Sequence, residues 1–379
     1  MSRGRITTKG ALLRKPGTRS GWSVEEIGID PPKAGEARIR LAASGLCHSD
    51  DHLDTGDVDL GGWAPVLGGH EGAGVVEEVG PDVTHFAPGD HVVMSFMPSC
   101  GRCAMCVKGY STLCELGAGV LGGTAPDGTH RVFTADGEGV GCMSYLGTFA
   151  PYVCVPTNAL VKIDPEVPLR SAALLGCGVP TGWGSSAYAA DMEIGDIVVV
   201  IGTGGVGMNA VQGARHRGAS VIVAVDPAEF KREQAPLFGA THTVASWDEA
   251  KTLVDGMTNG QGADRVIITM GVVPPEVMHP AQTMLRRGGT MVLTGVVPMG
   301  VKDIKMDLFD YVMCGKRLHG TLYGDTNARA DIPLLARLYR EGSLKLDELI
   351  TRTYPLEDIN QAFADMHAGK NLRGVIVYD

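Results

Sequence analysis

Apolar and polar residues alternate along the first third of the chain in a way that predicts short β-strands. Apolar segments interrupted by glycine and proline predict strands at residues 37–41, 74–79, 91–95 and 150–155. This pattern is typical of a β-rich domain whose loops carry chemistry. It ends in a stretch rich in alanine, leucine and glycine at 171–178, where we expect a domain boundary.

After residue 196 the pattern changes to longer apolar runs. The run at 197–201 precedes a glycine-rich loop and a helical stretch, and a second run follows at 221–225. Buried strands that alternate with helices are typical of a parallel sheet with helices on both faces. Further strands are predicted at 265–269 and 290–294, and a helix at 248–257.

The last segment combines an amphipathic stretch at 331–341 with a terminal strand at 374–378, which we expect to return to the first domain. The predicted fold class is α/β. A β-rich catalytic domain spans 1–178 and is completed by 322–379, and a doubly wound parallel-sheet domain spans 179–321. Two domains agree with the length, because 379 residues exceed what one hydrophobic core usually supports.

Composition and charge narrow the function classes. Hydrophobic residues make up 44% of the chain and charged residues 20%, as in ordinary globular enzymes. A net charge of −10 argues against nucleic-acid binding, because a surface that follows phosphates carries a basic excess. No apolar run reaches the length of a signal peptide or a membrane span. We therefore expect a cytoplasmic protein with neither nucleic acid nor membrane as partner.

Four of the nine cysteines form one tight cluster, with the spacing C-x2-C-x2-C-x7-C. Their thiolates can reach one ion, and a closed tetrahedral zinc site fits this spacing best. Such a site fixes a loop and leaves no position for a substrate. An iron–sulfur cluster, a redox pair or unligated thiols are the alternatives, and a nucleic-acid-binding zinc ribbon would need a basic surface that this segment lacks. The cluster consists of Cys100, Cys103, Cys106 and Cys114.

A second group of metal-binding residue types is spread over three segments. Cys47 precedes His48, Ser49 and Asp50, with His52 two residues on, and a second segment places His70 beside Glu71. Cys177 lies at the expected domain boundary, where a buried core cysteine is an equally good interpretation. Two thiolates and one imidazole would leave a fourth coordination position open, as a catalytic zinc site requires. The cysteines without such neighbours, interpreted as core or surface thiols, are Cys142, Cys154 and Cys314.

The glycine-rich loop after the run at 197–201 reads Gly202-Thr203-Gly204-Gly205-Val206-Gly207. A G-x-G-x-x-G motif between a buried strand and a helix is typical of dinucleotide binding, with the pyrophosphate at the N-terminus of the helix. Gly202 permits the tight turn, Gly204 lets backbone amides approach the pyrophosphate, and Gly207 lets the helix pack on the strand.

Asp226 follows the next strand at the spacing expected of a carboxylate that accepts hydrogen bonds from the adenosine ribose hydroxyls. Such a carboxylate repels a 2′-phosphate and favours NAD over NADP. Lys231 lies close enough to contact the same ribose. An aspartate at an ordinary strand-to-helix turn is the alternative interpretation.

Taken together, these motifs resemble the zinc-containing medium-chain alcohol dehydrogenase family over nearly the whole chain. Residues 47–52, 67–74 and 98–116 are most similar to the actinobacterial nicotinoprotein alcohol dehydrogenases, which keep NAD bound through turnover and are assayed with N,N-dimethyl-4-nitrosoaniline. The resemblance implies a GroES-like catalytic domain, a Rossmann NAD-binding domain, two Zn²⁺ per chain and bound NAD. Its chemistry is hydride transfer between an alcohol or aldehyde and NAD, across the cleft between the domains.

The resemblance also assigns roles at the catalytic zinc. Cys47, His70 and Cys177 would hold the ion, because two thiolates and one imidazole are the ligand set of the catalytic zinc in this family. Glu71 would enter the coordination shell transiently, and Asp50 would orient His70. Ser49 would take the proton of the alcohol and pass it through a ribose hydroxyl to His52 near solvent.

Further roles follow from the same resemblance. Phe96 would line the substrate pocket, Thr181 and Val206 would lie beside the nicotinamide, and Arg373 would lie near the pyrophosphate. His48 stands where many relatives carry arginine, so one phosphate contact would be weaker or pH-dependent. The full set expected to bind the cofactor is His48, Thr181, Gly202, Gly204, Gly205, Val206, Gly207, Asp226, Lys231 and Arg373.

Three alternatives remain open. The glutathione-dependent formaldehyde dehydrogenases are the first alternative by resemblance, but Ala118 stands where those enzymes carry an arginine for an acidic substrate. An alcohol dehydrogenase that exchanges NAD freely is the second alternative, and a zinc-stabilised binding protein without turnover is the third. The expected partners are a small alcohol or aldehyde, an external electron acceptor and further copies of the chain in a dimer or tetramer, since 116–146 resembles the insert of dimeric members.

Overall fold

The computed structural model of the protein describes residues 4–58 and 64–378. Contacts divide the chain into two compact units. Unit 1 comprises Met1–Cys177 and Asn327–Asp379, and unit 2 comprises Gly178–Thr326. The sequence-based limits of the two domains stay predictions. In the described part of the chain, no helix combines the length and the apolar composition that crossing a membrane requires.

Part of unit 1 is a closed β-barrel. Its core contains Leu12, Ile27, Ile29 and Leu67, which are fully buried. Most of these strands are too short for the alternation of apolar and polar residues to predict. In barrel order they are β1 (Ile6–Leu13), β2 (Ser23–Ile29), β7 (Val132–Thr134), β8 (Gly139–Cys142) and β4 (Val66–Leu67).

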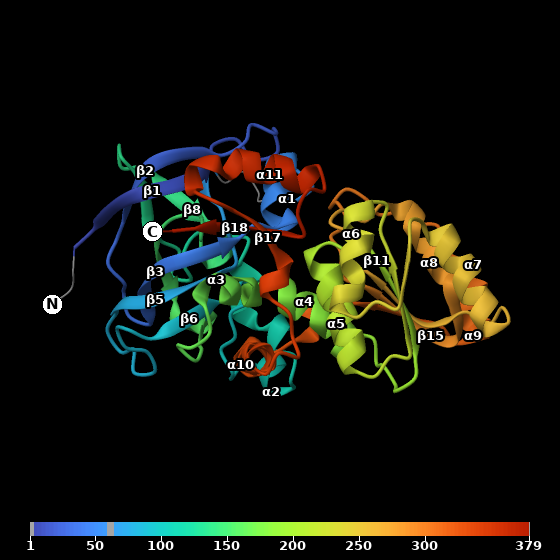
Figure 1. The fold of residues 1–379 in the computed structure, drawn as a ribbon. Helices are drawn as coiled ribbons and strands as arrows, with labels where there is room; N and C mark the ends of the chain where they lie inside the picture. The colour runs from blue at the N-terminus through green and yellow to red at the C-terminus, as the bar shows by residue number, and fades with distance from the viewer. Residues whose placement is uncertain (1–3, 59–63, 379) are drawn as a thin grey trace. The chain divides into compact units, whose positions relative to one another are not determined.

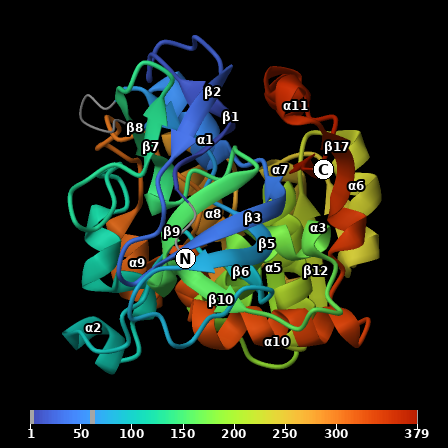
Figure 2. The ribbon, with the colours of Figure 1, turned by 90° about the vertical axis from the view of Figure 1, so that its left-hand side faces the viewer.

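The second sheet of unit 1 contains the strands predicted from the first third of the chain, and Figure 2 shows β3, β5, β6 and β10 side by side. The terminal strand pairs antiparallel with β3, with Ile376 opposite Ser44, which confirms its predicted return to the first domain. The path is β10 (Leu160–Lys162), β6 (His91–Met94), β5 (Gly72–Val79), β3 (Glu36–Gly45), β18 (Arg373–Val377) and β17 (Ile350–Tyr354), with β9 (Tyr152–Pro156) also on β3.

Helices of unit 1 are mostly short, except the predicted amphipathic one. That helix begins where the Asn327 side chain accepts a hydrogen bond from the Arg329 amide, and it buries Ile332 and Leu335. The helices are α1 (His48–Thr55), α2 (Ala104–Val107), α3 (Leu169–Ala172), α10 (Ala328–Arg340) and α11 (Ile359–His367).

Unit 2 is built on a parallel sheet, which together with unit 1 confirms the predicted α/β fold class. The strands at 197–201 and 221–225 are unbroken apolar runs, as expected of strands that are covered on both faces. In the described residues the sheet has the order β13 (His242–Val244), β12 (Val221–Val225), β11 (Ile197–Ile201), β14 (Ala263–Ile268), β15 (Leu285–Leu293) and β16 (Arg317–Gly320).

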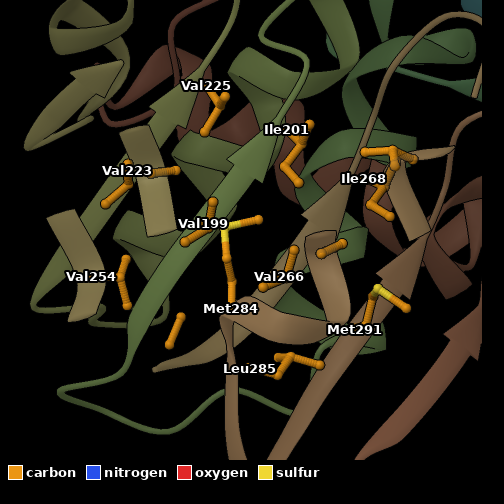
Figure 3. Close-up of a cluster of buried hydrophobic side chains, with 14 of the residues drawn as sticks. Val199, Ile201, Val223, Val225, Val254, Val266, Ile268, Met284, Leu285 and Met291 are labelled. Carbon is orange, nitrogen blue, oxygen red and sulfur yellow. The ribbon is translucent and has the colours of Figure 1, made fainter. Parts of the chain in front are cut away.

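Helices cover both faces of this sheet, with α5 and α6 on one side and α7, α8 and α9 on the other (Figure 1). Figure 3 shows a core of unit 2, where Val199 and Val223 of the strands meet Val254 of α7 and Met284 of α8. The helices are α4 (Gly178–Gly184), α5 (Gly205–His216), α6 (Glu229–Gln234), α7 (Trp247–Thr258), α8 (Met278–Met284) and α9 (Leu308–Cys314).

Candidate active site and metal centres

Three candidate zinc ligands from distant segments of unit 1 converge on one point. One ligand atom each from Cys47, His70 and Cys177 lies within 4.8 Å of the other two. A divalent zinc ion with thiolate bonds of about 2.3 Å and imidazole bonds of about 2.0 Å would fit between atoms at such separations. Cys177 therefore belongs to a group of residues that could hold a metal ion, and its role as a ligand stays a prediction.

Local structure explains how each segment reaches this point. Cys47 is the residue that precedes α1, in an extended conformation that turns its chain out of β3. The segment before Cys177 can approach β6 only because Gly176 lacks a side chain: a Cβ there would lie 2.4 Å from the carbonyl oxygen of Met94. The loop that carries His70 is held by two backbone hydrogen bonds from Thr148 and Phe149 to the carbonyls of residues 69 and 68.

Asp50 orients the imidazole of His70. Its Oδ1 accepts a hydrogen bond from the Gly69 amide at 2.9 Å and lies 3.2 Å from Nδ1 of His70. The carboxylate thereby assigns the proton of the ring to Nδ1 and leaves Nε2 for another partner. That Nε2 is buried and has no hydrogen-bond partner among the described residues.

Electrostatics at this point favour a cation. Contact with Cys177 is the main reason that the pKa of Cys47 lies well below its usual value, and His70 and Arg373 lower it further against the effect of burial. Burial disfavours the charged form of His70, but Asp50 and Cys47 raise its pKa to about 10. A site that draws a proton so strongly onto a buried imidazole also fits a divalent metal ion, which would take the place of that proton.

Glu71 follows His70 in the chain and forms a buried ion pair with Arg373 of β18. Its backbone carbonyl accepts a hydrogen bond from Thr148 Oγ1 at 3.1 Å. Arg373 had been expected near a pyrophosphate, and the structure shows its guanidinium against this carboxylate. Burial lowers the pKa of Arg373 from its usual value.

The predicted proton-transfer residues lie on α1. The Cys47 thiol lies 3.7 Å from Ser49 Oγ, so the hydroxyl adjoins the candidate metal site. His52 had been expected near solvent, but its side chain is only 1% exposed. The turn after α1 folds back on the helix end, where the amides of Gly56 and Val58 both donate to the His52 carbonyl.

Two other predicted residues of unit 1 lie close to these groups. The ring of Phe96 stands edge-on to His70, with their centroids 5.7 Å apart. The ring of His48 lies 6.4 Å from that of His52. The aromatic ring beside the metal-ligand histidine supplies an apolar wall at the candidate site.

The cysteine cluster also comes together as predicted. The sulfur atoms of Cys100, Cys103, Cys106 and Cys114 all lie within 4.8 Å of one another. Four sulfurs at about 2.3 Å from one zinc ion would lie about 3.8 Å apart, and the Cys103 and Cys114 sulfurs are separated by 3.9 Å.

Backbone amides favour the thiolate form of two of these cysteines, Cys100 and Cys103. The amides of Arg102 and Cys103 donate to the Cys100 sulfur at 3.4 and 3.2 Å. Amides of Cys106 and Glu115 lower the pKa of Cys103 to about 6. The cluster therefore is a candidate structural zinc site with four protein ligands and no open position.

In unit 2, the glycine motif forms the predicted turn between β11 and α5. Gly202 has φ +89°, a conformation that favours glycine. A Cβ on Gly207 would lie 2.0 Å from the Gly202 carbonyl oxygen, so this glycine is required for the close packing of the helix on the turn. α5 begins at Gly205, and its first amides are available to an anion.

Asp226 is placed beside this turn. Its Oδ2 accepts a hydrogen bond from the Thr203 amide at 2.9 Å, and its Oδ1 accepts one from the Ala228 amide at 3.0 Å. Lys231 Nζ lies 3.7 Å from Oδ2. α4 also packs closely on α5, because a Cβ on Gly182 would lie 2.0 Å from the carbonyl oxygen of Val206, so Thr181 and Val206 belong to neighbouring segments.

Comparison with known proteins gives a consistent picture. The profile of the alcohol dehydrogenase GroES-like domain matches residues 33–165, and that of the zinc-binding dehydrogenase family matches residues 205–340. The NDMA-dependent alcohol dehydrogenase of Amycolatopsis methanolica is 47% identical over 373 residues, which cover 98% of this chain and 99% of that protein.

A yeast enzyme, the S-(hydroxymethyl)glutathione dehydrogenase of Saccharomyces cerevisiae, is 39% identical and covers 94% of this chain and 93% of its own length. Among solved structures, the alcohol dehydrogenase zinc-binding domain protein of Burkholderia ambifaria superposes with a TM-score of 0.92 at 32% identity, covering 99% of this chain and 100% of that chain.

Proposed function

Because this chain belongs to the zinc-containing medium-chain alcohol dehydrogenase family, we propose that it oxidises alcohols with an NAD that stays bound and is re-oxidised in place by an external acceptor. Its general activity is that of a zinc-dependent alcohol dehydrogenase acting on alcohols and aldehydes. The proposal that NAD stays bound is supported by the 47% identity, over nearly the whole chain, with a relative whose name states dependence on NDMA.

Cys47, His70 and Cys177 hold the catalytic zinc in this proposal. The observation that carries it is the convergence of their three ligand atoms, together with the buried Nε2 of His70 that lacks a hydrogen-bond partner among the described residues. A zinc ion bound there would act as a Lewis acid that lowers the pKa of the alcohol. Glu71 adjoins this set and would enter the coordination shell only transiently.

The residues of α1 handle the proton that the alcohol loses. Ser49, next to Cys47, accepts it and passes it toward His52. Phe96 lines the apolar side of the pocket beside His70 and favours a substrate with a hydrocarbon group. Ala118, in the short 3-10 helix Glu115–Gly119 after the cysteine cluster, offers no charge for an acidic substrate, which supports an ordinary primary alcohol or aldehyde over a glutathione adduct.

Residues of unit 2 bind NAD. Gly202, Gly204, Gly205 and Gly207 form the pyrophosphate-binding turn, with Thr181 and Val206 on the nicotinamide side. Bound NAD would supply the hydride acceptor. Asp226 and Lys231 would contact the adenosine ribose, and the fixed carboxylate of Asp226 favours NAD over NADP.

His48 and Arg373 complete the set proposed for the phosphates. His48 is a weaker or pH-dependent partner compared with arginine. Arg373 is already paired with Glu71. Simple charge attraction by these two residues is therefore a poor explanation for retention of NAD.

The chain is also proposed to form a homo-oligomer through unit 2. α9 presents four apolar side chains on one face, at i, i+1, i+4 and i+5 spacing. β16 follows it as an edge strand of the described sheet, with all four residues exposed. Two copies around a twofold axis would pair identical edges and cover this face. The exposed residues are Leu308, Phe309, Val312 and Met313, with Leu318 on the strand.

A dye assay tests the retained cofactor. Purified protein freed of small molecules is denatured, and the supernatant is measured for NAD(H). The native protein is then given ethanol or benzyl alcohol and nitrosoaniline dye with no added cofactor. Dye bleaching at a rate that added NAD does not raise supports the proposal. Turnover only with added NAD would show a freely exchanging enzyme, and zinc-loaded protein inactive in both assays would favour a binding protein.

Two controls sharpen this assay. Asp226→Asn removes the charge that would hold the ribose, so bleaching should fall without added NAD and recover when NAD is supplied. Formaldehyde offered with and without glutathione tests the competing substrate class. A rate that requires glutathione would contradict the assignment to ordinary alcohols.

A further inference from the structure

The buried position of His52 raises the question of how a proton leaves it. The end of a proton route must contact water, but the His52 side chain is 1% exposed. Asp57 lies directly beside it, with Oδ2 3.2 Å from His52 Nδ1. The Asp57 side chain is 27% exposed, so this carboxylate lies between the buried ring and the surface.

The turn after α1 fixes Asp57 in that position. Gly56 ends the helix with φ +83°, a left-handed conformation that suits glycine. Thr55 Oγ1 donates to Asp57 Oδ2 at 2.8 Å, on the same oxygen that faces the imidazole. The Thr55 hydroxyl is the main reason that the pKa of Asp57 is lowered; burial opposes the shift and His52 adds to it. The carboxylate is therefore ionised at neutral pH.

Other charged groups on and around α1 have contacts of their own. Arg19 acts on Asp57 through its charge and further favours the carboxylate form. The ring of His48 lies 6.4 Å from the ring of His52. Asp51 pairs with Nε2 of His367 at 2.8 Å, and Asp54 accepts a hydrogen bond from the Gly21 amide at 3.2 Å.

We propose that Asp57 is a positioning residue that holds the Nδ1 proton of His52 and stabilises the imidazolium formed when Nε2 takes up the proton of the alcohol. This inference rests on the proposed role of His52. In this step the O–H bond of the alcohol breaks, its proton passes through Ser49, and an N–H bond forms at Nε2. The imidazolium then loses one proton to water, which restores the neutral ring with its Nδ1 proton on Asp57. A carboxylate that fixes the tautomer and raises the basicity of an imidazole is a general device in proton transfer.

The pH profile of alcohol oxidation tests this role. In Asp57→Asn the imidazolium loses its carboxylate partner, so the acidic limb of the kcat profile should move about one unit to lower pH. Because a weaker base accepts the proton less readily, the maximal kcat should fall about tenfold. Asp57→Glu should restore most of the maximal kcat and bring the acidic limb back close to its wild-type position. Thr55→Val, which keeps the carboxylate but loosens it, should shift the limb in the same direction by less.

Control variants separate this inference from the proposed function. Asp51→Asn removes another carboxylate of α1 that pairs with a histidine, and it should leave the limb in place. In a His52→Gln background, Asp57→Asn should cause no further shift, because the two residues act through one another. Unchanged zinc content and circular dichroism show that each variant folds.

Three results are decisive. A shift in Asp57→Asn that disappears in the His52→Gln background supports the inference. An unchanged limb in Asp57→Asn, with the limb lost in His52→Gln, would overturn the role of Asp57 while the role of His52 stands. A limb that survives His52→Gln would overturn both.

Discussion

Asp50 shows how one buried residue prepares another for a metal ion. Its carboxylate is fully buried and is fixed by the Gly69 amide, so its contact with His70 Nδ1 leaves little freedom to the ring. Burial raises the pKa of Asp50, and the charge of His70 opposes this shift. With a zinc ion at Nε2, the same carboxylate would balance part of the charge of the ion.

Replacement of Asp50 should weaken the catalytic zinc without removing a ligand. We expect Asp50→Asn to lower zinc affinity at this site about 10- to 100-fold, because the imidazole loses its charged partner. Competition with a chromogenic chelator measures this affinity, and the cysteine cluster in the same protein serves as the internal reference. If Asp50→Asn leaves the zinc affinity of the Cys47–His70–Cys177 site unchanged, Asp50 does not support His70 as a ligand.

At the residue scale, the sequence predicts the ligands better than their surroundings. Spacing alone places Cys100, Cys103 and the other two cysteines on one ion, because they share one short loop. The contact of Asp57 with His52 depends on the turn at Gly56, and no sequence motif predicts this contact. The pairing of Glu71 with Arg373 joins residues that are adjacent only because β18 returns to β3.

At the scale of elements, α9 and β16 carry the exposed apolar face proposed to join two copies. Leu308, Phe309, Val312 and Met313 are 64% to 79% exposed, a patch on the order of 400 Å², and such patches on a monomer commonly mark interaction sites. The preceding segment alternates Lys302, Asp303, Lys305 and Asp307, and this mixture of signs can pair with itself across a twofold axis.

A charge on α9 should break this association. We expect Phe309→Asp to weaken dimer formation at least 100-fold, because it places a carboxylate in a desolvated apolar interface. Sedimentation equilibrium measures the change. Ile194→Asp is the matched control, since Ile194 is 90% exposed elsewhere on unit 2. A wild-type protein that stays monomeric, or a Phe309→Asp variant that associates as tightly as wild type, would contradict the assignment.

Elements with a strong apolar signal could be predicted, and weakly patterned ones could not. β11 and β12 have the predicted bounds because both faces of each strand are buried. β4 has two residues and β16 is exposed throughout, so neither shows an apolar run. Tertiary pairing, and not local preference, creates such strands.

At the scale of the whole molecule, the chain divides its chemistry between two units. Unit 1 holds both metal-ligand groups and the proposed proton route, and its last strand returns from the far end of the sequence. Unit 2 holds the glycine turn and the carboxylate proposed to bind NAD. The alternation of strands and helices predicts unit 2 well, whereas the barrel of unit 1 depends on pairings between distant segments.

The central claim is that Cys47, His70 and Cys177 hold a zinc ion with one coordination position open to substrate. Anomalous diffraction at the zinc absorption edge, from crystals of the purified active protein, tests it most directly. The account predicts two peaks per chain, one among these three residues and one in the cysteine cluster, with the first peak and the activity both lost in Cys47→Ser. Fully active protein with a peak in the cysteine cluster alone would contradict it.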